Sequence, residues 1–288
     1  MKPLFGIDLT QDKQNTTNNC EAFLVESVAS AYKEALYKTT QEVNAIRKKG
    51  STPPVLYGLM LFCMAISVGF VTGILKSFDG ESAASASQKL ASNGGVLAVG
   101  AVFWALFIGL LIYSRIRAKK AKEALRAFGA DHRMEQAKAA IYNELGVPES
   151  ASAVDLLFFT YHVKNGEIRS KFRKNGGPIY RNEEYRVYVE GGKLYMVSTQ
   201  GKYAVDRASL CNIRMVKEPI NLPTWNKSLP PYHLVYEPFG IQKVQYGYEI
   251  KYHYALEFER GGEVWGIYFP NYELPTLQRI LGIGGSYG

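Results

Sequence analysis

The spacing of hydrophobic residues changes along the chain and divides it into parts with different expected structures. Two stretches, residues 53–75 and 94–113, are strongly apolar and contain no charged residue. Each has about 20 residues or slightly more, and a helix of that length crosses the ~30 Å hydrocarbon core of a bilayer. We therefore predict transmembrane helices at residues 53–75 and 94–114, joined by an outer loop at residues 76–93.

Apolar residues recur three to four positions apart on both sides of these stretches, which is typical of amphipathic helices. Val28, Leu36 and other apolar residues predict a cytoplasmic helix over residues 20–49. A similar stripe predicts stalk helices over residues 115–146. We expect these helices to form an antiparallel stalk, with a position in the membrane interface as the alternative. Residues 1–19 are polar and rich in Asn and Thr, and we expect them to be disordered.

Strand patterns begin near Val154, where short runs of Val, Tyr, Phe and Leu alternate with turn residues. The pairs Gly191-Gly192 and Gly261-Gly262 can supply the positive φ angles that tight hairpins need. These patterns predict a mainly-β domain over residues 154–282, made of antiparallel strands and closed by a short helix. Residues 283–288 are expected to form a tail.

Two segments of this β region resemble pleckstrin-homology-like (PH-like) domains of bacterial membrane proteins. They are residues 192–216, and the Phe-Pro-Asn-Tyr-Glu sequence at residues 269–273. The resemblance implies an antiparallel sheet or barrel capped by one C-terminal helix, attached here to a membrane hairpin. Residues 218–245 are longer than such a meander needs, and we interpret them as an insertion.

A basic run follows the first predicted strand of the domain. In lipid-binding PH-like modules, a Lys followed by a basic-x-Arg sequence at this hairpin binds phosphate head groups, and Lys164, Lys171 and Arg173 match that spacing. Alternate residues of a strand point to one face, so several of these cations could converge on an anion. The other interpretation is a solvated strand face, charged to prevent edge pairing. The candidate anion-, lipid- or partner-binding residues are Lys164, Arg169, Lys171, Arg173 and Lys174.

The charge of the chain supports a membrane location. The formal net charge is +8, and basic residues flank both apolar stretches, whereas the connecting loop is nearly balanced. This bias predicts cytoplasmic N- and C-termini in an inner or plasma membrane, with attraction to membrane lipid and no nucleic-acid partner. The basic residues after the second stretch are Arg115, Arg117, Lys119, Lys120 and Lys122.

Small residues occur at four-residue spacing in both apolar stretches. Such rows allow close approach of helices in lipid, either within the hairpin or between copies in a homo-oligomer. The two rows are Ala65, Gly69 and Gly73 in the first stretch, and Ala101, Ala105 and Gly109 in the second.

The sequence offers no catalytic, metal or cofactor motif. Its four histidines and three cysteines are scattered, and no phosphate-binding loop or nucleophile elbow is present. We therefore predict a non-enzymatic, membrane-anchored binding or adaptor protein with a protein, peptide or anionic head group as its partner. Two alternatives remain open. One is an accessory subunit of a channel or transporter, and the other is an enzyme with a site in residues 219–248, near His233, Glu237 and Tyr246.

Overall fold

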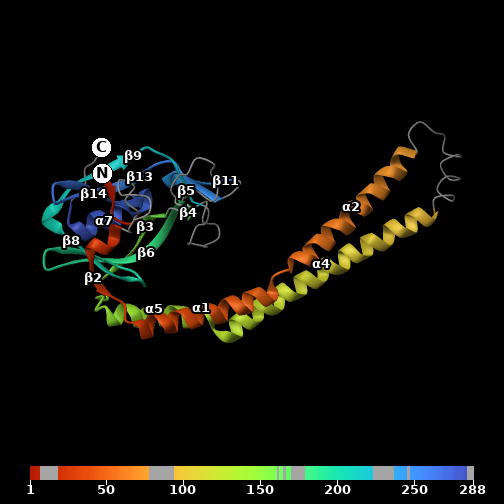
Figure 1. Ribbon diagram of the computed structural model, residues 1–288, viewed down its shortest axis with the longest axis horizontal. Coiled ribbons are helices and arrows are strands. Elements are labelled where there is room, and N and C mark those ends of the chain that lie inside the picture. Colours follow the sequence, from red (N-terminus) through yellow and green to blue (C-terminus); the bar gives the residue numbers. More distant parts are fainter. Residues whose placement is uncertain are drawn as a thin grey trace. The chain divides into compact units, whose positions relative to one another are not determined.

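The computed structural model of the chain (Figure 1) divides into two compact units. The β unit comprises Met1–Lys33 and Lys138–Gly288, and the helical unit comprises Glu34–Ala137. The structure describes residues 1–6, 19–77, 94–160, 162–164, 167–169, 179–222, 237–244 and 247–283.

The β unit contains a five-stranded antiparallel sheet with the order β2-β8-β7-β6-β3. Its hairpin between β6 and β7 turns at Gly191 and Gly192, whose φ angles of 55° and 77° confirm the predicted turn. Leu194 and Met196 face the core from β7, which follows the alternation expected of a strand with one buried face. The strands are β2 (Leu24–Ser27), β3 (Ser152–Thr160), β6 (Ile179–Glu190), β7 (Lys193–Val197) and β8 (Gly201–Asp206).

A second sheet has the order β1-β14-β13-β9. Gly261 and Gly262 make the turn between β13 and β14, with φ angles of 61° and 76°, as the sequence predicted. Helix α7 (Leu274–Leu281) follows and buries Leu277 and Leu281 in the core that both sheets share. The strands are β1 (Lys2–Pro3), β9 (Leu210–Val216), β13 (His253–Arg260) and β14 (Glu263–Pro270).

Two smaller sheets complete the β unit. The order β10-β12-β11 describes a three-stranded sheet in the region that the sequence marked as an insertion. It has its own apolar cluster with Leu157 of β3, formed by Ile220, Leu222, Ile241 and Ile250. The strands are β4 (His162–Lys164) and β5 (Glu167–Arg169), which pair with each other, and β10 (Ile220–Leu222), β11 (Ile241–Val244) and β12 (Gly247–Ile250).

The N-terminal segment is part of the β unit, so the prediction of disorder is wrong for residues 1–6. Leu4 and Phe5 are almost fully buried in the main core. Leu4 N donates to Gly266 O of β14 at 2.8 Å, and Phe159 N of β3 donates to Phe5 O at 3.0 Å. The segment therefore joins the two large sheets along one side. The rest of the predicted disordered region, residues 7–18, lies outside the described residues.

The helix predicted over residues 20–49 begins later than expected. Residues Asn19–Phe23 form a 3-10 turn (η1) and Leu24–Ser27 form β2, which pairs with β8. Helix α1 covers Ser30–Gly50. The prediction failed because the apolar residues before Ser30 pack in the core of the β unit, where Phe23 is buried, or pair with β8, and do not form one face of a helix.

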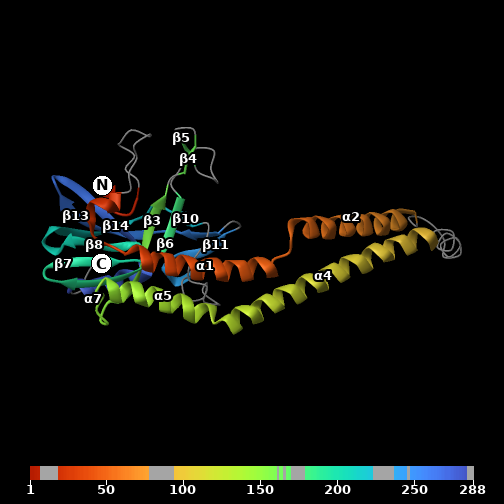
Figure 2. The same cartoon turned by 60° about the horizontal axis from the view of Figure 1, so that its bottom comes forward.

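The helical unit contains α2 (Pro54–Ser77) and α4 (Gly94–Phe128), both long and apolar enough to cross a membrane. The two helices lie side by side (Figure 2). Cys63 and Ser67 are buried at their contact, and Ser67 Oγ donates to Cys63 O at 2.7 Å, which satisfies the hydroxyl within its own helix. Helix α5 (Ala130–Glu144) follows Gly129, whose φ of 65° ends α4.

The small-residue rows do not form the contact between α2 and α4, so their predicted packing within the hairpin is wrong. A Cβ atom added at Gly69, Gly73 or Gly109 would meet no described atom within 4 Å. Ala65 lies two residues before the buried Ser67, about 200° around the helix. The rows therefore face away from the contact, and their role in a homo-oligomer remains a prediction. The other members, Ala101 and Ala105, are also exposed.

The predicted antiparallel stalk is present in the helical unit. Arg117 Nε of α4 donates to Lys49 O at the end of α1, 3.1 Å away. Earlier in α1, Thr40 Oγ1 contacts Met134 Sδ of α5 at 3.7 Å. Helix α1 therefore runs antiparallel to α4 and α5. Gly50 is required for close approach, because a Cβ atom there would lie 2.2 Å from Ala121 Cβ.

Candidate functional site

The predicted basic hairpin is only partly described. Lys164 ends β4 and Arg169 ends β5, and the register places Lys164 opposite Glu167 and Arg169 opposite His162. Lys171, Arg173 and Lys174 lie outside the described residues, and their convergence on an anion remains a prediction.

An open groove of about 410 Å³ lies on the β unit, and sequence analysis did not find it. Phe23, Val205 and Phe258 are buried side chains at its floor, whereas Leu24 and Val25 are exposed beside it. Its polar lining is balanced in charge. These polar residues are Lys193, Asp206, Ser209, Glu259 and Arg260.

The groove lies where strands of both sheets extend beyond their partners. Strand β2 pairs with β8 only at Gly201–Tyr203, so on that side Ala204–Asp206 have no strand partner among the described residues. The pairing of β13 with β9 ends at Phe258, which leaves Glu259 and Arg260 unpaired by β9. Main-chain groups at such edges can pair with an added extended segment. The groove therefore combines an apolar floor with accessible strand edges.

Arg260 holds the wall of the groove in place. Its Nη1 donates to Ala22 O at 2.7 Å, and its guanidinium lies over the Phe23 ring, 4.3 Å from the centroid. Phe23 in turn packs edge-to-face on Trp265 and Phe258, with centroid distances of 5.0 and 5.5 Å. This arrangement fixes η1 on the core, so the groove is a formed feature of the β unit.

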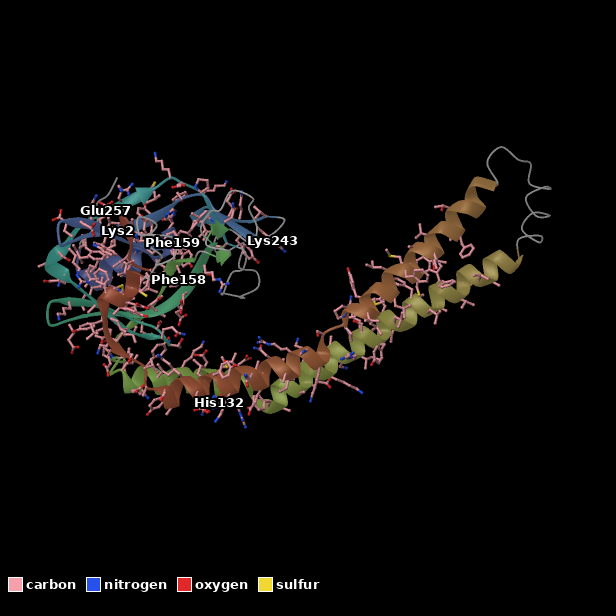
Figure 3. The ribbon with its side chains drawn as sticks, in the orientation of Figure 1. Lys2, His132, Phe158, Phe159, Lys243 and Glu257 are labelled. Atoms are coloured by element: carbon pink, nitrogen blue, oxygen red, sulfur yellow. The ribbon has the colours of Figure 1, made fainter. Side chains whose placement is uncertain are left out.

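Aromatic contacts elsewhere in the unit are mainly structural. Phe159 of β3, labelled in Figure 3, packs edge-to-face on Tyr268 of β14 at 5.0 Å. Tyr252 Oη accepts from Asn271 Nδ2 at 2.8 Å, and Tyr254 stacks on Phe269. These two tyrosines therefore pack within the unit, as aromatic residues in and beside strands commonly do.

Two buried titratable groups are held in their neutral forms. Burial raises the pKa of Cys20 to about 11, although a hydrogen bond with Tyr203 acts in the opposite direction, so Cys20 is a thiol at neutral pH. Burial lowers the pKa of His253 to about 4, and it outweighs a hydrogen bond to the Glu218 backbone that acts in the opposite direction; the nearby charge of Arg214 lowers the pKa further. Neither group is suited to chemistry at neutral pH, and both contribute to the core.

The alternative enzyme site falls largely outside the described part of the chain. His233 and Tyr246 lie outside it, and Glu237 begins a short 3-10 turn (η3, Glu237–Phe239). Within the described ranges, no group of three His, Cys, Asp or Glu side chains could hold a metal ion. Tyr248, from the same stretch, packs against the apolar cluster of the three-stranded sheet.

The juxtamembrane basic residues of the sequence analysis lie on α4 beyond its apolar part. Arg115, Lys119 and Lys120 are exposed, whereas Arg117 is partly buried by its contacts with Lys49 and Tyr113. The basic end of α1, residues 47–49, lies against this part of α4. Positive charge in the helical unit is thus concentrated beside the start of α2 and beside the end of the apolar part of α4.

Comparisons of the chain with protein-family models, with curated proteins and with solved structures found no match. The function must therefore be inferred from the geometry of the groove, the discontinuous β unit and the charge of the helices.

Proposed function

We propose that the chain is a two-span, multi-pass protein of an inner or plasma membrane, with both termini in the cytoplasm. Its β unit is a PH-like, non-enzymatic module that binds an extended segment of a partner protein in the groove. The protein acts as an adaptor that keeps this module, and whatever it binds, close to the membrane surface.

The observation that carries this proposal is the discontinuous β unit. Met1–Lys33 and Lys138–Gly288 share one hydrophobic core, although α2 and α4 lie between them in the sequence. A membrane crossed by only one of these helices would separate the two segments and prevent that core from forming. The two helices therefore cross together, which supports an even number of spans and termini on the same side.

Charge and strand order support the remaining parts of the proposal. Basic residues next to both helices favour a cytoplasmic side for the β unit. Strands β3, β6, β7 and β8 form a meander, β9, β13 and β14 form the second sheet, and α7 closes the chain. Antiparallel sheets followed by a single C-terminal helix support the PH-like assignment, in which β10–β12 form the insertion.

Selective labelling of cysteines will test the topology. Cys211 is exposed, whereas Cys20 and Cys63 are buried, so native chains should react with a membrane-impermeant maleimide at Cys211. We expect labelling in inside-out vesicles and protection in sealed right-side-out vesicles. A Ser85→Cys change in the loop should show the reverse pattern in a Cys211→Ser background. Labelling of both positions from the same side would contradict two spans.

Site-specific photocrosslinking will test the groove. A benzophenone amino acid at Val25, which is 57% exposed beside the groove, should form an adduct with one partner protein in native membranes. The same probe at Val264, which is exposed at 40% and is not a lining residue, serves as the control. An Ala204→Arg change should remove the Val25 adduct by blocking the strand edge. Equal adducts at both positions, or insensitivity to Ala204→Arg, would reject the groove as the binding surface.

A further inference from the structure

Two basic runs that are far apart in the sequence lie next to each other in the helical unit, one at the end of α1 and one on α4. Lys48 and Lys49 end α1, and Lys49 O accepts from Arg117 of α4, 68 positions away, at 3.1 Å. Next to this contact, the hydroxyls of Thr52 and Ser114 are hydrogen-bonded at 2.5 Å. We call this region the basic collar, and its cations are Lys48, Lys49, Arg115, Arg117, Lys119 and Lys120.

The collar lies directly beside the apolar parts of the helices. Thr52 and Ser114 mark the boundary, since α2 begins at Pro54 and α4 is uncharged from its start to Ser114. Arg115 to Lys120 then extend about 9 Å beyond Ser114 along the helix. The polar layer on each side of a bilayer is roughly 5–8 Å thick. With the apolar helices in the membrane, the collar is therefore level with the lipid head groups.

The collar carries an excess of positive charge among the described residues. Five of its six cations are exposed, and no described carboxylate forms an ion pair with them. Apart from Asp79 and Glu81 in the loop, the sequence has no acidic residue between Glu42 and Glu123. Like charges on neighbouring helical positions repel each other, so binding of an anion would stabilise the collar.

We infer that the collar binds the phosphate groups of anionic phospholipids, an inference that rests on the proposed membrane insertion. Phosphate oxygens accept hydrogen bonds from Lys and Arg, and basic residues at the surface attract anionic lipids. Arg117 has a different role from the other five cations. Its guanidinium caps Lys49 O and lies over Tyr113, so it holds α1 against α4 and positions the exposed cations around them.

Lipid retention in the full-length protein will test this inference. The protein is reconstituted in phosphatidylcholine nanodiscs with a minor fraction of phosphatidylglycerol, and co-purified lipid is counted by native mass spectrometry. The wild type should retain phosphatidylglycerol preferentially. An Arg115→Gln, Lys119→Gln, Lys120→Gln variant should lose this preference by about 100-fold at low ionic strength. A charge-matched control changes Lys33, Lys38 and Lys251 to Gln, all exposed and outside the collar, and should behave as the wild type.

The possible results separate the inference from the proposal on which it rests. Chains that fail to float with vesicles would reject membrane insertion and the lipid site together. Inserted chains with no preference for phosphatidylglycerol, or equal losses in the variant and the control, would reject only the lipid site. Displacement of the lipid by an equal concentration of inorganic phosphate would reassign the collar to free phosphate. A charge-retaining variant, Arg115→Lys with Lys119→Arg and Lys120→Arg, should keep the preference if positive charge is the determinant.

Discussion

Residues 130–288 alone will not form a cooperatively folded domain, although they contain most of the β unit. Removal of the N-terminal segment deletes strands β1 and β2 and four buried core side chains, Leu4, Phe5, Cys20 and Phe23. Burial of each large apolar side chain contributes about 1.5–3 kcal/mol, and a whole domain is typically stable by only about 5–15 kcal/mol. We expect the fragment to lack near-UV circular dichroism and to be digested rapidly by protease.

A fused fragment supplies the positive control. Ala29 N donates to Glu144 Oε1 at 3.1 Å, so the two segments of the β unit lie next to each other where the helical unit is inserted. A short Gly/Ser linker from Lys33 to Lys138 should therefore restore a folded, protease-resistant domain. In the full chain, Phe5→Ala should destabilise the β unit by about 3–5 kcal/mol, whereas Tyr37→Ala, at an exposed helical position, should have little effect. Cooperative unfolding of residues 130–288 alone would contradict this account.

Acidification from pH 7 to pH 4 should destabilise the β unit through His253. The side chain is buried at the start of β13, its Nδ1 has no described hydrogen-bond partner, and its pKa is lowered from 6.5 to about 4. Between these values the unfolded chain binds a proton that the folded chain excludes, so stability rises with pH in this range. The shift corresponds to about 3 kcal/mol, present in full above pH 6.5 and lost as the pH falls to about 4.

Comparison of the wild type with His253→Gln will isolate this contribution. Unfolding in urea and detergent, followed by tryptophan fluorescence, gives the free energy of unfolding of each protein. The two free energies should converge towards pH 4, and their dependence on pH should differ between pH 4 and 6.5. Glu183 acts in the opposite direction, because burial raises its pKa and its contribution falls with increasing pH. That effect is common to both proteins and cancels in the difference. Identical slopes for the two proteins would contradict the lowered pKa of His253 in the folded chain.

Local patterns were sufficient to predict the helices and the hairpin turns. The two apolar helices and the glycine turns depend on residues that are close in sequence, and the structure has each of them. Ile141 and Leu145, which lie in the amphipathic segment predicted over residues 115–146, are both buried. The mainly-β character followed from alternation and turn residues, while the PH-like assignment and the membrane location remain proposals.

Features that depend on long-range contacts could not be predicted from local patterns. Leu4 and Phe5 lie in a short segment without helical or strand periodicity, and their burial depends on β14 and β3, which lie far along the chain. The groove takes its lining from η1, β2, β8 and β13, so no continuous motif marks it. The contact between α2 and α4 passes through Cys63 and Ser67, and four-residue spacing alone could not show which helix face would be used.

The pairing of the N-terminal segment with β14 has a consequence for synthesis of the protein. Leu4 and Phe5 leave the ribosome long before Glu263–Pro270, which supplies the partner strand for residues 2 and 3. Native contacts between distant segments form slowly, and exposed apolar residues attract chaperones and proteases in the interval. The β unit is therefore completed only after translation has passed β14. A chain that terminates before this strand exposes its N-terminal segment, which makes it a substrate for quality control instead of a partly active protein.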